Sequence, residues 1–264
     1  MSDILVETKP ARRDISGAVA DAIGRRIVIG EFPPGALLPT ELELCAALGV
    51  SRPALREGFR MLAAKGMILS RRKRGAMVQP RTLWNMLDAA VLAWHLDEEP
   101  NAAYIDGLFE ARMVVEPAAA AMAARRAAPG DIEVITAAFA DMSRAQREAA
   151  GESDGTSQTV SADLRFHEAI LAACGNHFFA SFGALIGSSL IASFRLNWRT
   201  HASEPGLSLG QHEAVLAAIR DGDAARAASC MRALLASAAR DARQALIASR
   251  CAPKPGQPPG QPPG

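Results

Sequence analysis

The stretch TELELCAALGVSRPALREGFRML, residues 40–62, decides the fold because it contains two short helices together with the signals that begin and end them. Thr40 followed by Glu43 is the capping-box pattern of a helix start, and Gly49 is typical of a helix end. Ser51 then caps a second helix with a proline in its first turn, where a proline loses no hydrogen bond. This spacing predicts a helix-turn-helix.

The flanking residues extend this unit into a winged helix. Upstream, apolar residues recur at helical spacing from Ser16, the expected N-cap, up to a closing glycine. Downstream, short strands are expected at residues 67–70 and 76–79, on either side of a basic hairpin. We therefore expect a winged helix-turn-helix domain over residues 15–80, preceded by a flexible arm over residues 1–14.

The net charge of +1 conceals an asymmetry between the two halves of the chain. Residues 1–82 contain 14 Lys and Arg against 8 Asp and Glu, whereas the remainder contains 15 against 20. A basic first part joined to an acidic second part indicates that only the first meets a polyanion. No signal peptide and no apolar run near the ~20 residues of a membrane span is recognisable, so we expect a cytoplasmic protein without a membrane partner.

Three arginines lie four residues apart on the second helix of the quoted stretch. Arg52, Arg56 and Arg60 therefore share one face. An arginine fork can bind guanine or a phosphate, and Ser51 with the helix N-terminus suits a phosphate. We expect Arg52 and Arg56 to read the bases and Arg60 to lie on the surface or at a phosphate. A solvated helix face is the alternative.

The expected hairpin adds a second basic element. Its sequence places Arg71, Arg72, Lys73 and Arg74 in a row before Gly75. So many like charges indicate an anionic partner, and the first three are expected to contact phosphates. Gly75 would let the tip of the hairpin approach a groove closely.

The segment GEFPPGALLPTELELCAALGVSRPALREGFRMLAAKGMILSRRKRGAMV resembles the DNA-binding domain of the GntR family of bacterial transcription regulators, and the resemblance covers residues 15–78. It implies DNA contacts at Ser51, Arg52 and Arg56 of the recognition helix and at Arg74 and Gly75 of the wing. The chain departs from the family pattern in one place, because Leu42 stands where the family often has a base-reading arginine. We therefore expect an unusual operator, or a larger share of the reading for Arg52.

The rest of the chain is expected to be helical, so the fold class is mainly α. After a linker and first helix over residues 81–100, an antiparallel helical bundle is expected over residues 101–250, and a disordered Pro/Gly tail over residues 251–264. The expected helices cover residues 84–96, 101–127, 130–149, 160–174, 177–198, 208–221 and 223–249.

Three potential metal ligands lie in this helical part. Asp163 and His167 are four residues apart on one helix face, and His212 begins a later helix that could bring it to them. Such a mixed N and O donor set suits Zn²⁺, Ni²⁺ or Mn²⁺, and the spacing does not choose among them. Surface charge with two satisfied histidines is the alternative.

The segments FEARMVVEPAAAAMAARR, DLRFHEAILAACGN and HEAVLAAIRDGDAARAA resemble the all-α ligand-binding (FCD) domain of the FadR subgroup of the same family. Many members bind a metal through one Asp and three His, with an organic acid beside it. The resemblance puts Asp163, His167 and His212 at the first three ligand positions. The fourth position is Leu234, so a weak site, a recruited His177 or His201, and a metal-free effector pocket all remain open.

The resemblance also places Arg112 in the effector pocket, where it would pair with a carboxylate through two parallel hydrogen bonds. The alternative is an intrahelical pair with Glu116, four residues along. Asp163, His167 and His212 would complete the effector contacts.

The stretch PRTLWNMLDAAVLAWHL resembles the corresponding region of family members that repress galactonate operons, which implies a sugar acid such as an aldonate as effector. Its Trp84, Trp94 and His95 are expected to pack between the domains. We thus expect a homodimeric, effector-released repressor on a palindromic operator, and no enzyme. The competing readings are a regulator of another carboxylic acid, a metal-dependent enzyme of small carboxylic acids, and a non-specific nucleic-acid binder that uses the wing alone.

Overall fold

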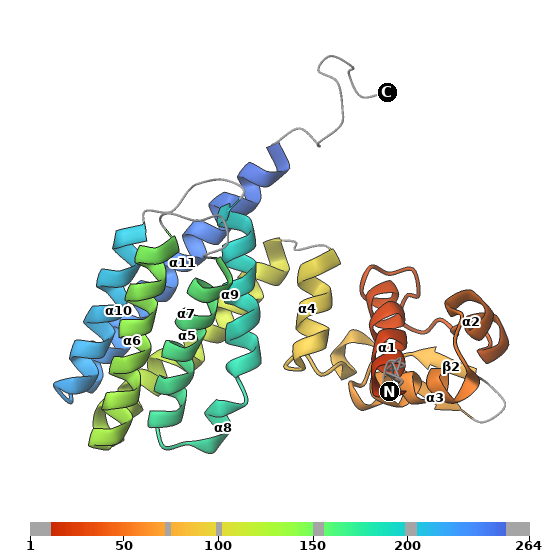
Figure 1. Ribbon diagram of the computed structural model, residues 1–264, viewed down its shortest axis with the longest axis horizontal. Coiled ribbons are helices and arrows are strands. Elements are labelled where there is room, and N and C mark those ends of the chain that lie inside the picture. Colours follow the sequence, from red (N-terminus) through yellow and green to blue (C-terminus); the bar gives the residue numbers. More distant parts are fainter. Residues whose placement is uncertain (1–11, 72–74, 99–101, 150–155, 199–204, 252–264) are drawn as a thin grey trace, which may run out of the picture. The chain divides into compact units, whose positions relative to one another are not determined.

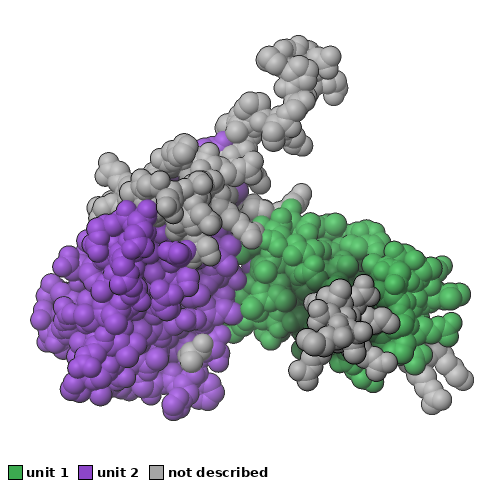
Figure 2. All heavy atoms as spheres, in the orientation of Figure 1, with its two compact units in different colours: residues 1–99 green, residues 100–264 purple. Residues whose placement is uncertain are grey.

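The computed structural model describes residues 12–71, 75–98, 102–149, 156–198 and 205–251 (Figure 1). The chain divides into two compact units, residues 1–99 and residues 100–264 (Figure 2). Within the described residues the regular structure is helical, apart from a small sheet in the first unit. The expected fold class, a winged helix-turn-helix followed by a helical bundle, is confirmed.

The helix-turn-helix forms with the caps that its sequence predicts. Its helices are α1 (Arg12–Val28), α2 (Glu41–Leu48) and α3 (Arg52–Ala64). The Thr40 hydroxyl accepts from the Glu43 amide at 3.3 Å, and the Glu43 carboxylate accepts from the Thr40 amide at 2.8 Å. Gly49 ends α2 with φ of 64°, and the Ser51 hydroxyl accepts from the third amide of α3. Local signals therefore determine where the turn between α2 and α3 begins and ends.

The start of α1 differs from the prediction. The structure has the helix already at Arg12, so Ser16 lies inside it and is buried, 6% exposed, instead of capping it. The reason is packing: a Cβ on Gly58 of α3 would lie 3.3 Å from the Ser16 carbonyl oxygen and 2.6 Å from Val19. Ser16 thus faces α3, a position unsuited to an exposed helix end.

The wing has one more segment than its sequence predicts. Strands β1 (Ile68–Arg71) and β2 (Gly75–Val78) pair antiparallel, as expected to within one residue. Leu37 forms a bridge to Met77 on the other side of β2. This bridge pairs residues that are 40 positions apart in sequence, so no local sequence pattern predicts it.

The helix expected over residues 84–96 begins later, as α4 (Ala89–Glu98), after the short 3-10 helix η1 (Arg81–Leu83). The Trp84 indole donates to the carbonyl oxygen of Gln79 at 2.9 Å, which keeps this residue out of a helix. The Asp88 carboxylate accepts from the amides of residues 90 and 91 at 3.0 and 3.2 Å, and so caps α4.

Helix α4 belongs to the first unit. The Trp94 indole donates to the Asp21 carboxylate of α1 at 2.6 Å, and Arg25 of α1 pairs with Asp97 at 2.8 Å. Trp84 and Trp94 are both part of the buried core of this unit. The two tryptophans are therefore explained by packing inside the N-terminal unit.

The close contact between α1 and α4 gives a prediction. A Cβ on Gly24 would lie 2.4–2.8 Å from the Trp94 ring, so Gly24→Ala is expected to lower the free energy of unfolding by about 1–3 kcal/mol. Gly17→Ala is the matched control, because open space surrounds this residue of the same helix and alanine favours helices by up to about 1 kcal/mol. Chemical denaturation measures both, and equal stabilities would contradict the packing of α4 described above.

The second unit is built from helices alone in its described residues. They are α5 (Ala102–Arg126), α6 (Pro129–Ala149), α7 (Thr156–Ala173), α8 (His177–Ala180), α9 (Gly183–Trp198), α10 (Pro205–Arg220) and α11 (Ala224–Cys251). Figure 1 shows α5, α6, α7, α9, α10 and α11 gathered into one bundle. The core of this unit includes the fully buried Phe166. No helix among the described residues is long and apolar enough to cross a membrane.

Three helix boundaries in this unit differ from the prediction. Residues 177–198 form two helices, α8 and α9, and not one, while α7 and α10 begin three or four residues earlier than expected. Helix α10 starts at Pro205, which lies between the helices expected over residues 177–198 and 208–221. A proline fits there because the first helical residue needs no amide hydrogen. The arm was expected over residues 1–14 and the tail over residues 251–264. Residues 12–14 instead begin α1 and residue 251 ends α11, whereas residues 1–11 and 252–264 lie outside the described residues.

Candidate functional site

The recognition-helix arginines lie on the surface, but each in a different setting. Arg52 is exposed at the first residue of α3, just after its cap Ser51. The Arg56 side chain is 64% exposed and pairs with Glu41 of α2 at 3.1 Å. Arg60 pairs with Glu57 of its own helix at 2.8 Å. The shared face that the spacing predicts is present, while its charges are partly matched by carboxylates.

The turn before this face carries an exposed apolar side chain. Leu42, in the first turn of α2, is 65% exposed. It follows Glu41, whose carboxylate contacts Arg56 of the recognition helix. The position where the family often has arginine thus presents a methyl-bearing side chain to solvent.

Most of the predicted wing contacts fall outside the described residues. Arg72, Lys73 and Arg74 belong to residues 72–74, and Arg71 is described by its backbone alone. Gly75 is described: its φ is 82°, and nothing lies within 4 Å of a Cβ built on it. Glycine is therefore favoured there by the left-handed backbone and not by crowding.

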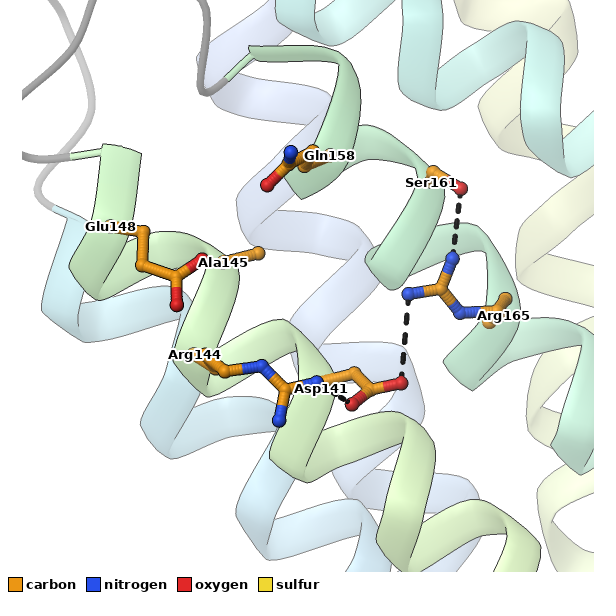
Figure 3. A pocket seen from close by; sticks show the side chains of 7 residues that line it. All are labelled: Asp141, Arg144, Ala145, Glu148, Gln158, Ser161 and Arg165. Carbon is orange, nitrogen blue, oxygen red and sulfur yellow. Dashed lines mark hydrogen bonds and ion pairs between the residues drawn. The ribbon is translucent and has the colours of Figure 1, made fainter.

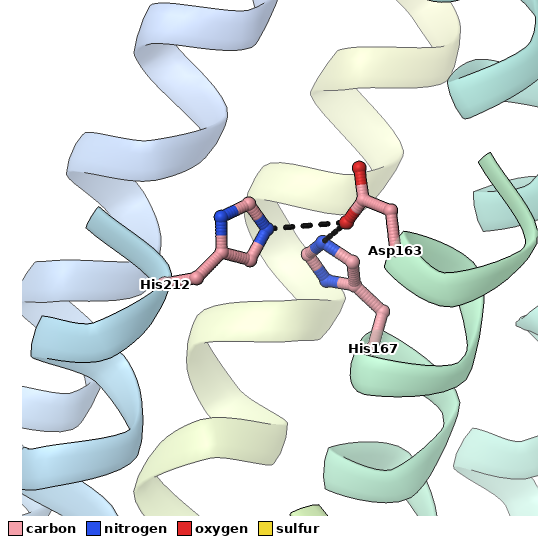
Figure 4. A group of neighbouring side chains, drawn as sticks. All are labelled: Asp163, His167 and His212. Carbon is pink, nitrogen blue, oxygen red and sulfur yellow. Dashed lines mark hydrogen bonds and ion pairs between the residues drawn. The ribbon is translucent and has the colours of Figure 1, made fainter. Parts of the chain in front are cut away.

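Asp163, His167 and His212 converge in the second unit. The helical spacing predicts the common face of the first two, and the fold brings His212 to them. Figure 4 shows Asp163 and His167 on α7 and His212 on α10, with both rings turned toward the carboxylate. The Asp163 Oδ1 lies 3.1 Å from Nε2 of His212 and 3.3 Å from Nε2 of His167. One donor atom from each residue lies within 4.8 Å of the others.

The far nitrogen of each ring has its own partner. Nδ1 of His212 contacts the Ser208 carbonyl oxygen at 2.7 Å, which makes it the protonated nitrogen and directs Nε2 toward Asp163. Nδ1 of His167 lies 2.5 Å from the Glu116 carboxylate, although the two atoms do not meet in hydrogen-bond geometry. Partners of this kind orient imidazoles that bind metals.

The cluster is closed on one side and accessible on the other. The side chains of His167 and His212 are 2% and 3% exposed, whereas that of Asp163 is 24% exposed. Asp163 is therefore the member of the cluster that is partly exposed to solvent, while the two rings lie in the core.

The electrostatics of the cluster follow from opposite charges that lie close together in the core. Burial alone would lower the pKa of His167, but the carboxylates of Glu116 and Asp163 outweigh it and raise that pKa to about 9. Burial alone would raise the pKa of Glu116, but Arg112 and His167 lower it to about 2. The pKa of Asp163 is likewise lowered, because the two histidines outweigh its burial.

Arg112 is in contact with this cluster through Glu116. Its side chain is 1% exposed, its Nε lies 2.5 Å from the Glu116 carboxylate, and its Nη1 donates to the Ser189 hydroxyl at 2.7 Å. The intrahelical pair, which the sequence left as the alternative, is therefore formed. Sequence reasoning missed that Glu116 also meets His167, although the i, i+4 spacing of Arg112 and Glu116 pointed to this carboxylate.

The fourth ligand position is apolar, as the sequence shows. Leu234 lies in α11, 4% exposed, within the core of the bundle. Of the two histidines considered as substitutes, His177 is exposed on α8 and is not part of the cluster, and His201 lies outside the described residues. The described donor set is thus one carboxylate and two imidazoles.

A separate pocket of about 290 Å³ lies between α6 and α7 (Figure 3). Its arginines are already matched, because Asp141 pairs with both Arg144 and Arg165, and Arg165 also donates to Ser161 at 2.9 Å. None of the three cluster residues lines it. The lining residues are Asp141, Arg144, Ala145, Glu148, Gln158, Ser161 and Arg165.

Two family models match this chain. The model of bacterial regulatory proteins of the gntR family matches residues 15–78, and the model of the FCD domain matches residues 107–237. The first covers the winged helix and the second contains the whole Asp163, His167 and His212 cluster.

Three curated relatives from Escherichia coli K12 are similar over most of their length. The galactonate operon transcriptional repressor is 39% identical over 211 residues, 78% of this chain and 88% of its own. The HTH-type regulator YieP is 32% identical over 86% of this chain and 95% of its own. A putative L-lactate dehydrogenase operon regulatory protein is 34% identical over 84% of both.

Solved structures share the fold at lower identity. Lar, which controls expression of the Listeria monocytogenes agr system, superimposes with a TM-score of 0.63 at 18% identity, covering 87% of this chain and 96% of its own. E. coli McbR/YncC gives a TM-score of 0.51 at 17% identity, covering 87% and 97%. The domains and the relatives agree with one another: this chain belongs to the GntR family of bacterial regulatory proteins, in its FadR-type subgroup with an FCD domain, and it is a transcription regulator and not an enzyme.

Proposed function

We propose that this regulator is a homodimeric repressor of a sugar-acid catabolic operon and that a small organic acid releases it from a palindromic operator. The observation that carries the proposal is the pairing of an exposed, capped arginine helix with a buried chelating cluster that is open along one carboxylate edge. The first suits DNA, and the second suits a small anionic or polyhydroxylated ligand.

Two groups of residues would bind the DNA: one would position the protein on the phosphates, and the other would read the bases. Arg71, Arg72 and Lys73 of the wing would contact phosphates, which makes affinity fall with salt. Ser51, Arg52 and Arg56 would face base edges or the adjacent phosphates, and Arg74 and Gly75 would follow the groove. Two copies related by a two-fold axis would read the two halves of a palindrome.

The cluster fits a divalent metal in its chemistry. Its donors are one carboxylate and two imidazoles, and each imidazole has a partner at its far nitrogen, which is the usual support of metal-binding histidines. Zn²⁺, Ni²⁺ and Mn²⁺ all accept this mixed set. A bound ion would supply positive charge and open coordination positions for an acid. With Leu234 at the fourth position, the protein itself would fill only three.

The effector is proposed from the cluster and from one relative. A sugar acid offers one carboxylate and neighbouring hydroxyls, which match the imidazoles, the Asp163 edge and a metal. The E. coli galactonate operon repressor supports an aldonate such as galactonate, while the putative L-lactate dehydrogenase operon regulator supports another hydroxy acid as the alternative. The effector would release the DNA only if it binds the dimer arrangement that does not fit the operator more tightly than the arrangement that does.

The proposal is tested by footprinting the full-length protein on the DNA upstream of its own gene, with and without galactonate. A discrete two-fold footprint that galactonate removes, and that the neutral sugar galactose leaves in place, is the expected result. L-lactate as releasing acid would select the alternative effector. Protection that smears along any DNA would overturn the proposal, and light scattering of the free protein would check the dimer.

The buried Arg112–Glu116 pair gives a stability prediction. Arg112→Ala removes one of the two cations, Arg112 and His167, that lie against the buried Glu116 carboxylate, so a loss of about 3–5 kcal/mol in the free energy of unfolding is expected. Arg112→Ala combined with Glu116→Gln should lose less, because the unmatched charge is gone. Urea denaturation of both variants measures this difference. A single variant as stable as the wild type, yet unresponsive to effector, would instead support the predicted role of Arg112 as effector ligand.

A further inference from the structure

The Arg56 side chain is held by a carboxylate from the neighbouring helix. Its Nε lies 3.1 and 3.2 Å from the two carboxylate oxygens of Glu41, and its Nη2 lies 3.1 Å from one of them. Glu41 is the first residue of α2, whose start is fixed by the Thr40–Glu43 capping box. The pair therefore joins α2 to α3 across the turn between them.

The geometry of this pair leaves one particular edge of the guanidinium for DNA. Arginine carries five N–H donors in a fixed planar fork. Glu41 takes the side edge, formed by Nε and Nη2, so the outer edge formed by Nη1 and Nη2 remains. That outer edge matches the O6 and N7 acceptors of guanine in the major groove.

The pair between Glu41 and Arg56 contributes little to folding stability. The side chains of Arg56 and Glu41 are 64% and 39% exposed, and exposed ion pairs contribute little to stability. A carboxylate beside DNA is also repelled by the phosphates. Glu41 instead holds the Arg56 side chain in one conformation. A long side chain that is already held in one conformation loses less conformational entropy when it binds a base.

We propose that Glu41 is a positioning residue for operator reading, which directs the outer edge of Arg56 to one guanine in each half-site. This inference rests on the proposed operator binding. It adds Glu41 as a positioning residue and one guanine per half-site as the base that Arg56 reads. The second pair on the same helix, Glu57 with Arg60, serves as a contrast. It joins residues three apart within α3, so it links no second element and fixes nothing relative to α2.

The test uses the full-length protein and operators that it selects from random duplexes. Dissociation constants are measured for the selected site, for the same site with each base pair changed, and for random DNA. In the wild type, changing one symmetric G·C pair of the selected site should weaken binding by roughly 5- to 150-fold. Arg56→Ala should abolish this difference between the selected and the changed site. Glu41→Gln should lose about 3- to 10-fold of this discrimination.

Three further measurements separate positioning from a structural role. Glu41→Gln should bind random DNA as well as the wild type or better, because a negative charge is removed, and its melting temperature should stay unchanged. Glu41→Gln added to Arg56→Ala should cause no further loss of discrimination. Glu57→Gln, the matched control, should keep the wild-type preference at every position.

Two results would overturn the inference while leaving the proposed function intact. Either Glu41→Gln keeps full discrimination at the Arg56-dependent base pair, or it tightens binding to every sequence alike, which would mean that Glu41 merely restrains Arg56 in the free protein. A wild type that selects no two-fold site from random duplexes would instead overturn the proposed function itself.

Discussion

Arg52→Ala is expected to remove most of the preference of this regulator for its operator over random DNA. Arg52 is exposed at the first residue of the recognition helix, and the N-terminal residues of such a helix contact base edges. Each bidentate arginine–guanine contact discriminates by about 1–3 kcal/mol, and a dimer would lose this contact in both half-sites. Binding to random DNA should change far less, because it depends on the remaining phosphate contacts.

The measurement is the ratio of operator to random-DNA affinity at one fixed salt concentration. Arg60→Ala is the matched control, since Arg60 lies on the same helix face but pairs with Glu57. It should lower both affinities slightly and leave their ratio near that of the wild type. If Arg52→Ala retains the wild-type ratio, Arg52 does not read a base, and the predicted division between reading and positioning arginines is wrong.

Asp163→Ala is expected to abolish both metal retention and the response to effector. Asp163 is the member of the cluster that both imidazoles face, and it forms the edge open to solvent. Purified wild type should contain roughly one divalent ion per chain by elemental analysis, and the variant should contain none. Added Zn²⁺ should raise the melting temperature of the metal-stripped wild type only, because a ligand of the native state stabilises it.

The same site predicts a direction for pH dependence. Without metal, the pKa of His167 is raised to about 9, so His167 carries a proton at pH 7 that a metal must displace. Metal affinity should therefore rise with pH up to about 9, by as much as about tenfold per unit for one proton released. Asp141→Ala, which removes a carboxylate from the separate α6–α7 pocket, is the control and should keep the metal. A wild type that holds no metal at any pH would favour an effector pocket without metal.

The sequence by itself determined those features that depend on near neighbours along the chain. The caps at Thr40, Gly49 and Ser51 were predictable because a cap is a contact over three or four residues. The common face of Arg52 and Arg56, and the adjacency of Asp163 and His167, follow from the helical repeat. His212 was a possible third member from its residue type, and the family resemblance assigned it a ligand position, but no local spacing could join it to the other two.

Tertiary structure decided the features that depend on contacts between distant residues. The bridge from Leu37 to Met77 and the burial of Trp94 against α1 join residues 40 and 73 apart, and neither leaves a periodic signal. Whether Arg112 meets an effector or Glu116 was open in the sequence, because either partner satisfies its charge. In the structure Arg112, 1% exposed, pairs with Glu116, and the same carboxylate lies against His167. A contact between Arg112 and an effector stays a prediction.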